Sequence, residues 1–115
     1  MEEIDVKLIV AIVQDEDAGR LVSEMTNRGF GVTKLATTGG FLRAGNTTLI
    51  SGVEDERMEE ALDLITQICK SREQITASTT PMGGGPGGVY VPYPIRVTVG
   101  GATVFVLEVS QFLKV

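Results

Sequence analysis

Hydrophobic residues in the first part of the chain change from strand-like to helix-like spacing. Residues 6–13 form a nearly continuous apolar run rich in β-branched side chains, which predicts a strand buried on both faces. The acidic run Asp15-Glu16-Asp17 follows, and apolar residues then recur at i, i+3, i+4 and i+7 from Ala18 to Met25, before Gly29. This pattern predicts an amphipathic helix with an acidic N-cap and a glycine C-cap.

The middle of the chain predicts two further strands and a second helix. Residues 30–38 and 47–53 have the mixed polarity of strands and are separated by glycine-rich sequence. Asp55 is expected to cap the second helix, and Lys70 and Arg72 follow it at the negative end of the helix dipole. The apolar stripe of this helix comprises Met58, Ala61, Leu62, Ile65, Ile68 and Cys69.

A short strand predicted at residues 74–78 completes the element order βαββαβ. This order is typical of ferredoxin-like α+β domains, in which two helices cover one face of an antiparallel sheet. A chain of 115 residues has the size of one such domain, so we expect a single domain spanning residues 1–115.

An extra β-hairpin is predicted near the C-terminus, where residues 95–99 and 102–109 flank the turn Gly100-Gly101. The expected pairs on one apolar face are Val99 with Ala102, Val97 with Val104, and Ile95 with Val106. Phe105 and Leu107 then lie on the opposite, polar face. Exposed apolar groups of this size indicate a subunit interface or a ligand, or else packing beneath the chain's own long loop.

That long loop is predicted at residues 79–94, which contain Pro-Met-Gly-Gly-Gly-Pro-Gly-Gly and then Tyr-Val-Pro-Tyr-Pro. Loops of this length without secondary structure are usually functional or disordered in compact domains. The proline-held pair Tyr90 and Tyr93 favours a loop that folds over a ligand, and a flexible surface connection is the alternative.

The composition removes several classes of function. The chain has no histidine and a single cysteine, Cys69, so it offers no internal disulfide, no Cys-His nucleophile pair and no complete zinc site. The longest apolar run is too short to span a bilayer, and the acidic start lacks the features of a secretory signal. We therefore expect a cytoplasmic protein with no membrane contact, no metal, no cofactor and no catalytic residue.

The formal net charge of −5 opposes binding to nucleic acid polymers. Acidic residues are nevertheless absent from residues 25–53 and 74–107, where the basic residues are Arg28, Lys34, Arg43 and Arg96. If these two stretches meet in the fold, they form a surface that can accept a small anion. The alternative is that acidic residues simply favour helices over strands.

Residues 33–48 carry the most informative chemistry. Their glycines allow tight turns and a close approach of backbone N–H groups to phosphate oxygens. Phe41 and Leu42 offer surfaces on which a base can stack, and Asn46 offers a donor and an acceptor to an adenine edge. With the hydroxyl of Thr33 and its neighbouring threonines, this segment predicts a site for a purine nucleotide.

Several segments closely resemble the PstA family, also called DarA, of cyclic di-AMP receptors. They are residues 34–48, 12–15, 81–84, 92–94 and 99–106, so the resemblance covers nearly the whole chain. It implies a PII-like ferredoxin fold, a homotrimer, and one cyclic di-AMP in each of three inter-subunit clefts. It also implies a T-loop at about residues 38–46 and a B-loop at about residues 79–94. Ordering of the T-loop on binding is then expected to signal to an unknown downstream protein.

The resemblance implies a ligand site that contains Thr33, Gly40, Phe41, Leu42, Asn46 and Gly52 of one subunit. Phe105 would come from the neighbouring subunit, and we add Arg43 as the cation of the T-loop. Two positions depart from the family. Gly31 stands where an arginine or a similar polar contact is common, and Lys114 stands where a glutamine is common.

Two other functions stay open. The chain could be a receptor for another nucleotide or anion, as PII proteins bind ATP and 2-oxoglutarate. It could also be a hydrolase similar to acylphosphatases, with Arg43 and Asn46 holding an acyl phosphate. The lack of histidine, and of a carboxylate in the acid-free stretches, argues against an enzyme.

Overall fold

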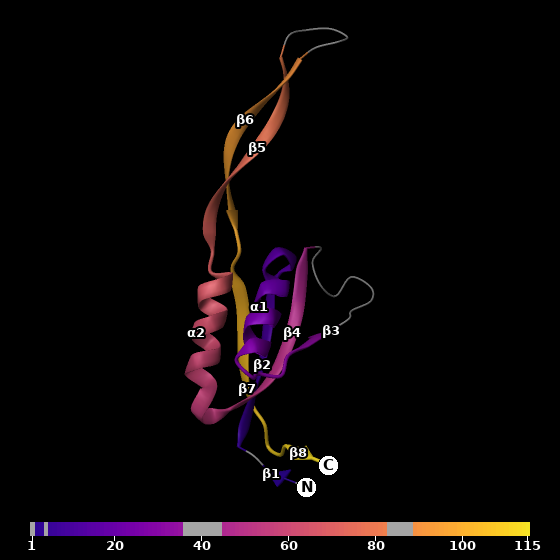
Figure 1. Cartoon of the computed structure of the whole chain (residues 1–115), viewed down its shortest axis with the longest axis vertical. Helices are drawn as coiled ribbons and strands as arrows, with labels where there is room; N and C mark the ends of the chain where they lie inside the picture. The colour runs from indigo at the N-terminus through magenta and orange to yellow at the C-terminus, as the bar shows by residue number, and fades with distance from the viewer. Residues whose placement is uncertain (1, 4, 36–44, 83–88) are drawn as a thin grey trace.

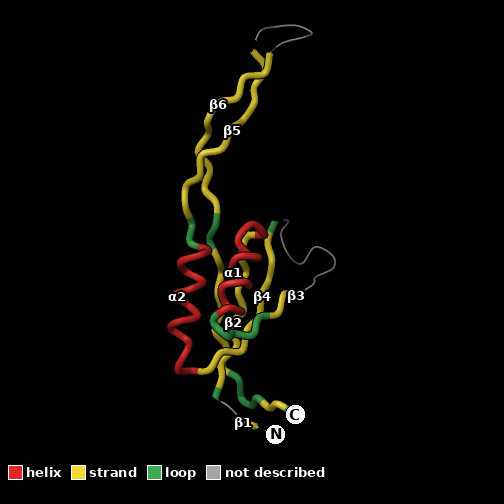
Figure 2. Tube along the Cα trace, viewed as in Figure 1, coloured by secondary structure: helices red, strands yellow, loops and turns green. Residues whose placement is uncertain are grey.

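A computed structural model describes residues 2–3, 5–35, 45–82 and 89–115, with side chains at 5–35, 45–77 and 93–115. Two helices cover one face of a four-stranded antiparallel sheet, and a two-stranded ribbon extends from this body (Figures 1 and 2). The molecule is therefore elongated, with extents of 72 × 30 × 20 Å. Both termini lie at the end opposite the tip of the ribbon (Figure 1).

The elements in chain order are β1 (Glu2–Glu3), β2 (Val6–Gln14), α1 (Asp15–Asn27), β3 (Thr33–Leu35), β4 (Asn46–Glu54), the 3-10 helix η1 (Asp55–Arg57), α2 (Met58–Cys69), β5 (Arg72–Met82), β6 (Val89–Val99), β7 (Ala102–Glu108) and β8 (Leu113–Lys114). The main sheet has the strand order β3-β4-β2-β7, and β5-β6 and β1-β8 form separate two-stranded sheets. Both predicted helices and the strands expected at residues 6–13 and 47–53 are confirmed.

Strand β2 divides its side chains between two faces of the sheet. Ile9, Ala11 and Val13 are buried beneath the helices. Leu8 and Ile12 point to the other face and are only half-buried, because no helix in the described part of the chain covers that face. The expected burial of this strand on both faces is therefore wrong for a single chain. The core comprises Ile9, Ala11, Val13, Ala18, Leu21, Met25, Phe30, Leu49, Val53, Ala61, Leu64, Ile65, Ile68 and Cys69.

The four strands and two helices fit a ferredoxin-like domain, but the strand that completes the sheet is not the expected one. Residues 74–78 belong to β5, which pairs with β6 and leaves the sheet. β7 pairs along the free edge of β2 instead, with Val104 opposite Ala11 and Val106 opposite Ile9. Residues 104–107 of β7 are all apolar, so they continue the apolar side chains of β2 on both faces of the sheet. Residues 74–78 are mostly polar and would not do so.

The predicted hairpin between residues 95–99 and 102–109 is wrong. Gly100 and Gly101 instead join two sheets, since Val99 pairs with Arg72 of β5 and Ala102 pairs with Val13 of β2. Both glycines have a positive φ, 81° and 92° respectively. A two-residue hairpin turn needs the same conformation, so the local sequence does not distinguish the two connections.

The predicted long loop at residues 79–94 is mostly strand. β5 and β6 pair in continuous register from Arg72 with Val99 to Met82 with Val89, and residues 83–88 lie outside the described residues. Three prolines of this ladder fall in alternate pairs, so their nitrogens all face the same way relative to the partner strand. They are Pro81, Pro92 and Pro94. A strand tolerates proline where its nitrogen faces an outer edge.

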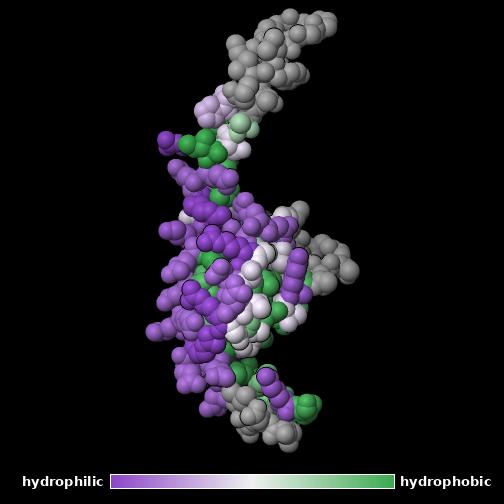
Figure 3. Space-filling view, in the orientation of Figure 1, coloured by the Kyte–Doolittle hydropathy of each residue, from purple (hydrophilic) through white to green (hydrophobic). Residues whose placement is uncertain are grey.

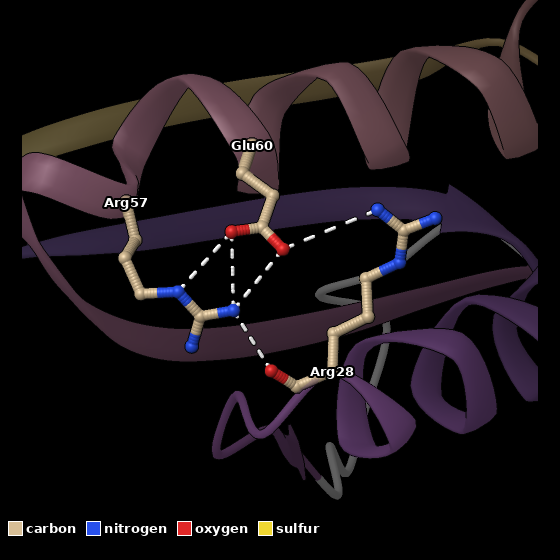
Figure 4. A network of polar contacts seen from close by, with 3 residues as sticks. All are labelled: Arg28, Arg57 and Glu60. Carbon is tan, nitrogen blue, oxygen red and sulfur yellow. Dashed lines mark hydrogen bonds and ion pairs between the residues drawn. The ribbon is translucent and has the colours of Figure 1, made fainter.

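Phe30 follows α1 and does not start a strand, because its N–H donates to the Met25 carbonyl at 2.9 Å. Of the strand expected at residues 30–38, the described residues show β3 alone, and residues 36–38 lie outside them. The Phe30 ring is buried, with the Arg57 guanidinium 4.0 Å from its centre. Arg57 also donates to the Arg28 carbonyl at 2.8 Å and to both carboxylate oxygens of Glu60 (Figure 4). This network ties the end of α1 to the start of α2.

The expected side-chain caps are absent from both helices. Gln14 precedes α1 and Arg57 precedes α2, and neither side chain caps its helix. The carboxylate of Asp15 instead accepts the Thr47 hydroxyl, and that of Asp55 accepts the Lys7 ammonium at 3.0 Å. These two acids therefore tie the starts of the helices to the sheet.

Hydrogen bonds fasten the base of the ribbon to the body. Arg72 lies at the C-terminal end of α2 as expected, where it donates to the Lys70 carbonyl at 3.2 Å, and it also donates to the buried carboxylate of Asp17, at 2.8 and 3.3 Å. The N–H of Gly101 donates to the Cys69 carbonyl at 2.5 Å, and the N–H of Gly100 donates to Gln14 Oε1 at 2.6 Å. The end of α2 and the corner between β2 and α1 thus fix the ribbon.

We predict that Gly100→Ala destabilises the protein more than Gly101→Ala. A Cβ at either position is strained by the positive φ, at a cost of about 1–2 kcal/mol. At Gly100 it would also lie 2.5 Å from Arg72 Nη1 and 2.6 Å from the Lys70 carbonyl, whereas at Gly101 it meets nothing within 4 Å. Overpacking adds about 1–3 kcal/mol. Thermal unfolding at matched protein concentration measures the difference, and equal losses would contradict it.

We also predict that the Cys69 thiol reacts slowly in the native protein. Burial, together with the nearby Asp17 carboxylate, raises the pKa of this thiol from 9.0 to about 11. Alkylation at pH 8 should therefore be far slower than in denaturant, as measured by mass spectrometry. Because the unfolded thiol loses its proton first, the free energy of unfolding should fall as the pH rises from 9 to 11. Equal alkylation rates with and without denaturant would refute the burial of this thiol.

Candidate functional site

The sheet has one face that no helix covers in the described part of the chain, and we call it the helix-free face. The register of β3, β4, β2 and β7 places alternate residues of each strand on it. They are Thr33, Leu35, Asn46, Thr48, Ile50, Gly52, Glu54, Val6, Leu8, Val10, Ile12, Gln14, Thr103, Phe105 and Leu107. Among these, Glu54 is the one charged residue.

Large apolar side chains are exposed on the helix-free face. Phe105 is 53% exposed, Leu107 is 44% exposed and Leu35 is 39% exposed. The side of the molecule that carries the helices is, in contrast, mainly hydrophilic (Figure 3). An apolar sheet face of this kind is typical of an interface or a ligand site. The exposure expected for Phe105 and Leu107 is confirmed, although it arises from pairing with β2 and not from a hairpin.

Two of the predicted ligand residues, Thr33 and Gly52, line a groove of about 370 Å³ at the β3 edge of this face. Gly31 and Lys114, the two positions that depart from the resembling family, line the same groove. Its other walls are Val6, Leu8, Gly29, Ile50, Ser51, Glu54 and Phe112. The groove therefore brings together residues that are far apart in the sequence.

Both glycines on this side leave open space. A Cβ at Gly31 or at Gly52 would meet nothing within 4 Å, and neither residue has a positive φ. The Ser51 hydroxyl donates to the Gly31 carbonyl at 2.6 Å and holds the segment before β3 against β4. The groove can thus accept a ligand or a larger side chain at either glycine.

Asn46 lies on the helix-free face but outside this groove. It pairs with Gln14 and is half-buried, and four residues of strand separate it from Ile50, or about 13 Å. The adjacent Gly45 carbonyl accepts the N–H of Asp15 at 2.8 Å. These contacts fix the end of the predicted T-loop at the corner between β2 and α1.

Phe105 occupies the opposite edge of the sheet from Thr33. It pairs with Val10, and both β2 and β4 lie between its strand and β3. The two edges are separated by three strand spacings, or about 14 Å. The other four predicted site residues, Gly40, Phe41, Leu42 and Arg43, lie outside the described residues.

Three of the four basic residues expected to form a cationic surface lie elsewhere than on this face, and the fourth, Arg43, lies outside the described residues. Arg28 lies 4.0 Å from Glu60 in the network between the helices, and Lys34 pairs with Leu49 on the helix side of the sheet. Arg96 lies on the ribbon, 3.9 Å from Glu73. The two acid-free stretches do share one sheet, through β3, β4 and β7. In the described part of the chain, however, the helix-free face of this sheet carries no basic residue.

Sequence reasoning missed several residues of the groove. Leu8, Ile50 and Phe112 all line it. The alternation within β2 and β4 could have identified Leu8 and Ile50. Phe112 has no such signal, because it belongs to the irregular segment between β7 and β8.

The described residues show neither a metal centre nor a membrane span. Within them, no group of three or more histidine, cysteine, aspartate or glutamate residues is arranged to hold a metal ion. No helix among them is both long and apolar enough to cross a membrane.

Comparison with known proteins identifies the family of this chain. A solved structure of a functionally unknown protein from Pediococcus pentosaceus ATCC 25745 is similar, with 43% identity and a TM-score of 0.76 over 97% of this chain and 99% of that chain. A putative PII-like signaling protein from Thermus thermophilus matches at 19% identity and a TM-score of 0.43, over 87% of this chain and 94% of the other. The family model described as "cyclic-di-AMP receptor" matches residues 6–115. This chain therefore belongs to the cyclic-di-AMP receptor family.

Proposed function

We propose that this protein is a cytoplasmic receptor that binds cyclic di-AMP between the subunits of a homotrimer. Membership of the family supports a nucleotide-binding signalling role. One observation carries the finer proposal: Thr33 and Gly52 lie near one edge of an exposed apolar sheet face, and Phe105 lies near the other. A neighbouring subunit that packs on this face brings its Phe105 to the groove of the first.

Association of subunits accounts for the exposed apolar side chains. Phe105, Leu107 and Leu35 are left in water by a single chain, and burial of apolar surface contributes about 25 cal/mol per Å². Heterologous contacts between the two edges of the sheet generate a closed ring when the rotation between subunits closes. Three copies give such a ring three equivalent clefts.

The chemistry of each cleft suits a nucleotide with two bases. Apolar side chains on the helix-free face offer surfaces for bases, and Asn46 offers both a donor and an acceptor. The phosphates need donors and positive charge, which we assign to the T-loop with its glycines and Arg43. Because glycine-rich segments lose much entropy when they become ordered, ligand contacts that order the T-loop provide the signal to a downstream protein.

Isothermal titration calorimetry with cyclic di-AMP tests the ligand. We expect saturable binding with three sites per trimer, and competition by ATP, cyclic di-GMP or 2-oxoglutarate only at much higher concentration. Preference for one of these competitors would establish the alternative of a receptor for another ligand. Turnover of acyl phosphate by the purified protein would establish a hydrolase.

A mixing experiment tests whether two subunits share the site. We predict that Asn46→Ala and Phe105→Ala each weaken binding about tenfold or more, since stacking and base-edge contacts each contribute about 1–3 kcal/mol. In a mixed trimer, the interface between an intact Asn46 and an intact Phe105 restores one site. Equal mixing should therefore recover about a quarter of the wild-type sites at wild-type affinity.

The control is sedimentation of each variant, and we expect both variants to remain trimers. If both groups belonged to a site within one subunit, no mixture would contain an intact site. Failure of the mixture to recover any tight site would therefore overturn the shared cleft while leaving the ligand in place.

We predict that Gly31→Arg tightens binding of cyclic di-AMP about ten- to a hundredfold. A hydrogen bond from a charged group contributes about 1.5–3 kcal/mol, and position 31 lines the groove with open space and no positive φ. Gly19→Arg is the matched control, because Gly19 lies on α1 and a Cβ there also meets nothing within 4 Å. Equal tightening by both variants would show a general charge effect, and no tightening by Gly31→Arg would exclude position 31 from the site.

A further inference from the structure

One buried hydroxyl group on the helix-free face lacks a hydrogen-bond partner among the described residues. Thr48 is only 6% exposed, and its Oγ1 is buried without a partner in the part of the chain that the structure describes. The other buried hydroxyls of β4 are satisfied: Thr47 donates to the Asp15 carboxylate and Ser51 donates to the Gly31 carbonyl. A buried polar group without a partner is costly, so native structures rarely keep one without a reason.

The register places Thr48 in the middle of the proposed binding face. It lies between Ile12 of β2 and Leu35 of β3, and Leu35 is the last described residue before the T-loop. Asn46 is two residues away on the same strand and therefore on the same face. Thr103 of β7 is opposite Ile12 on the far side of β2. Thr48 is thus a polar position between two apolar neighbours, Ile12 and Leu35, and close to the predicted ligand residue Asn46.

We propose that the Thr48 hydroxyl contacts bound cyclic di-AMP directly and donates a hydrogen bond to the edge of an adenine base. This contact rests on the function proposed above and adds a residue to its site. Ile12 and Leu35 on either side favour a flat, weakly polar group over a phosphate, whose charge would lack a partner on this part of the face. Ring nitrogens of adenine are acceptors for a hydroxyl donor.

The structure implies opposite effects on stability and on affinity when this hydroxyl is removed. Without ligand, the hydroxyl has no described partner, so its replacement by a methyl group of the same shape should not destabilise the protein. With ligand, the same change leaves a base nitrogen without its donor. A residue with only a structural role would not separate the two measurements in this way.

The test compares Thr48→Val, which removes the hydroxyl, with Thr48→Ser, which keeps it. Thr48→Val should melt at or above the wild-type temperature without ligand, and should bind cyclic di-AMP about tenfold more weakly in calorimetry. Thr48→Ser should bind within about threefold of the wild type. Sedimentation should show unchanged trimers for both variants.

Any other outcome would overturn this inference and would show which assumption fails. Wild-type affinity of Thr48→Val would exclude the contact while the proposed function stands. A lower melting temperature of Thr48→Val without ligand would show that the protein itself satisfies the hydroxyl, and dissociation of its trimers would assign the hydroxyl to the subunit interface. If the wild type does not bind cyclic di-AMP, the proposed function fails first, and this contact fails with it.

Discussion

Pairing of β2 along both of its edges governs the rest of the molecule. Nine residues of β2 are in register with β4, and seven of them are also in register with β7. Because side chains alternate along a strand, this central position gives one row to the helices and one row to the helix-free face. The first row closes the core beneath α1 and α2, and the second leaves Leu8, Val10 and Ile12 for contacts outside the chain's own core.

The same alternation lets one sheet close the core with one face and leave its other face free of helices in the described part of the chain. Thr47 and Ser51 of β4 face the helix side and hold neighbouring segments in place, whereas Asn46, Thr48 and Gly52 face the other way. Substitutions on the helix-free face can therefore be made without opening the core, because successive side chains of a strand point to opposite faces.

Periodicity predicted the elements that local sequence determines. The helical spacing from Ala18 to Met25 and the apolar run of β2 were sufficient for those elements. Closure of the sheet by β7 could not be predicted in this way, because Gly100 and Gly101 suit a hairpin and a crossing between sheets equally well. The pairing of β5 with β6 was missed because glycine and proline suggest a loop, whereas their tolerance depends on which edge the proline nitrogens face.

The candidate site, like the fold, could be predicted from the sequence only in part. Family motifs identified Thr33, Asn46, Gly52 and Phe105, and strand register then placed all four on one face. Sequence could not show that the Thr48 hydroxyl lacks a partner among the described residues, because whether a hydroxyl finds a partner depends on the strands beside it. Nor could sequence show that Arg28 is engaged by Glu60, since that pairing joins two helices far apart in the chain.

The ribbon of β5 and β6 has the geometry of a lever. Each strand has 11 residues, so the tip lies about 36 Å from the base, and a rotation of about 10° at the base would move it by about 6 Å. Gln14 bonds the base of the ribbon, and the next residue, Asp15, bonds the Gly45 carbonyl at the end of the T-loop. A rotation at this one corner would therefore displace the tip of the ribbon far more than its base.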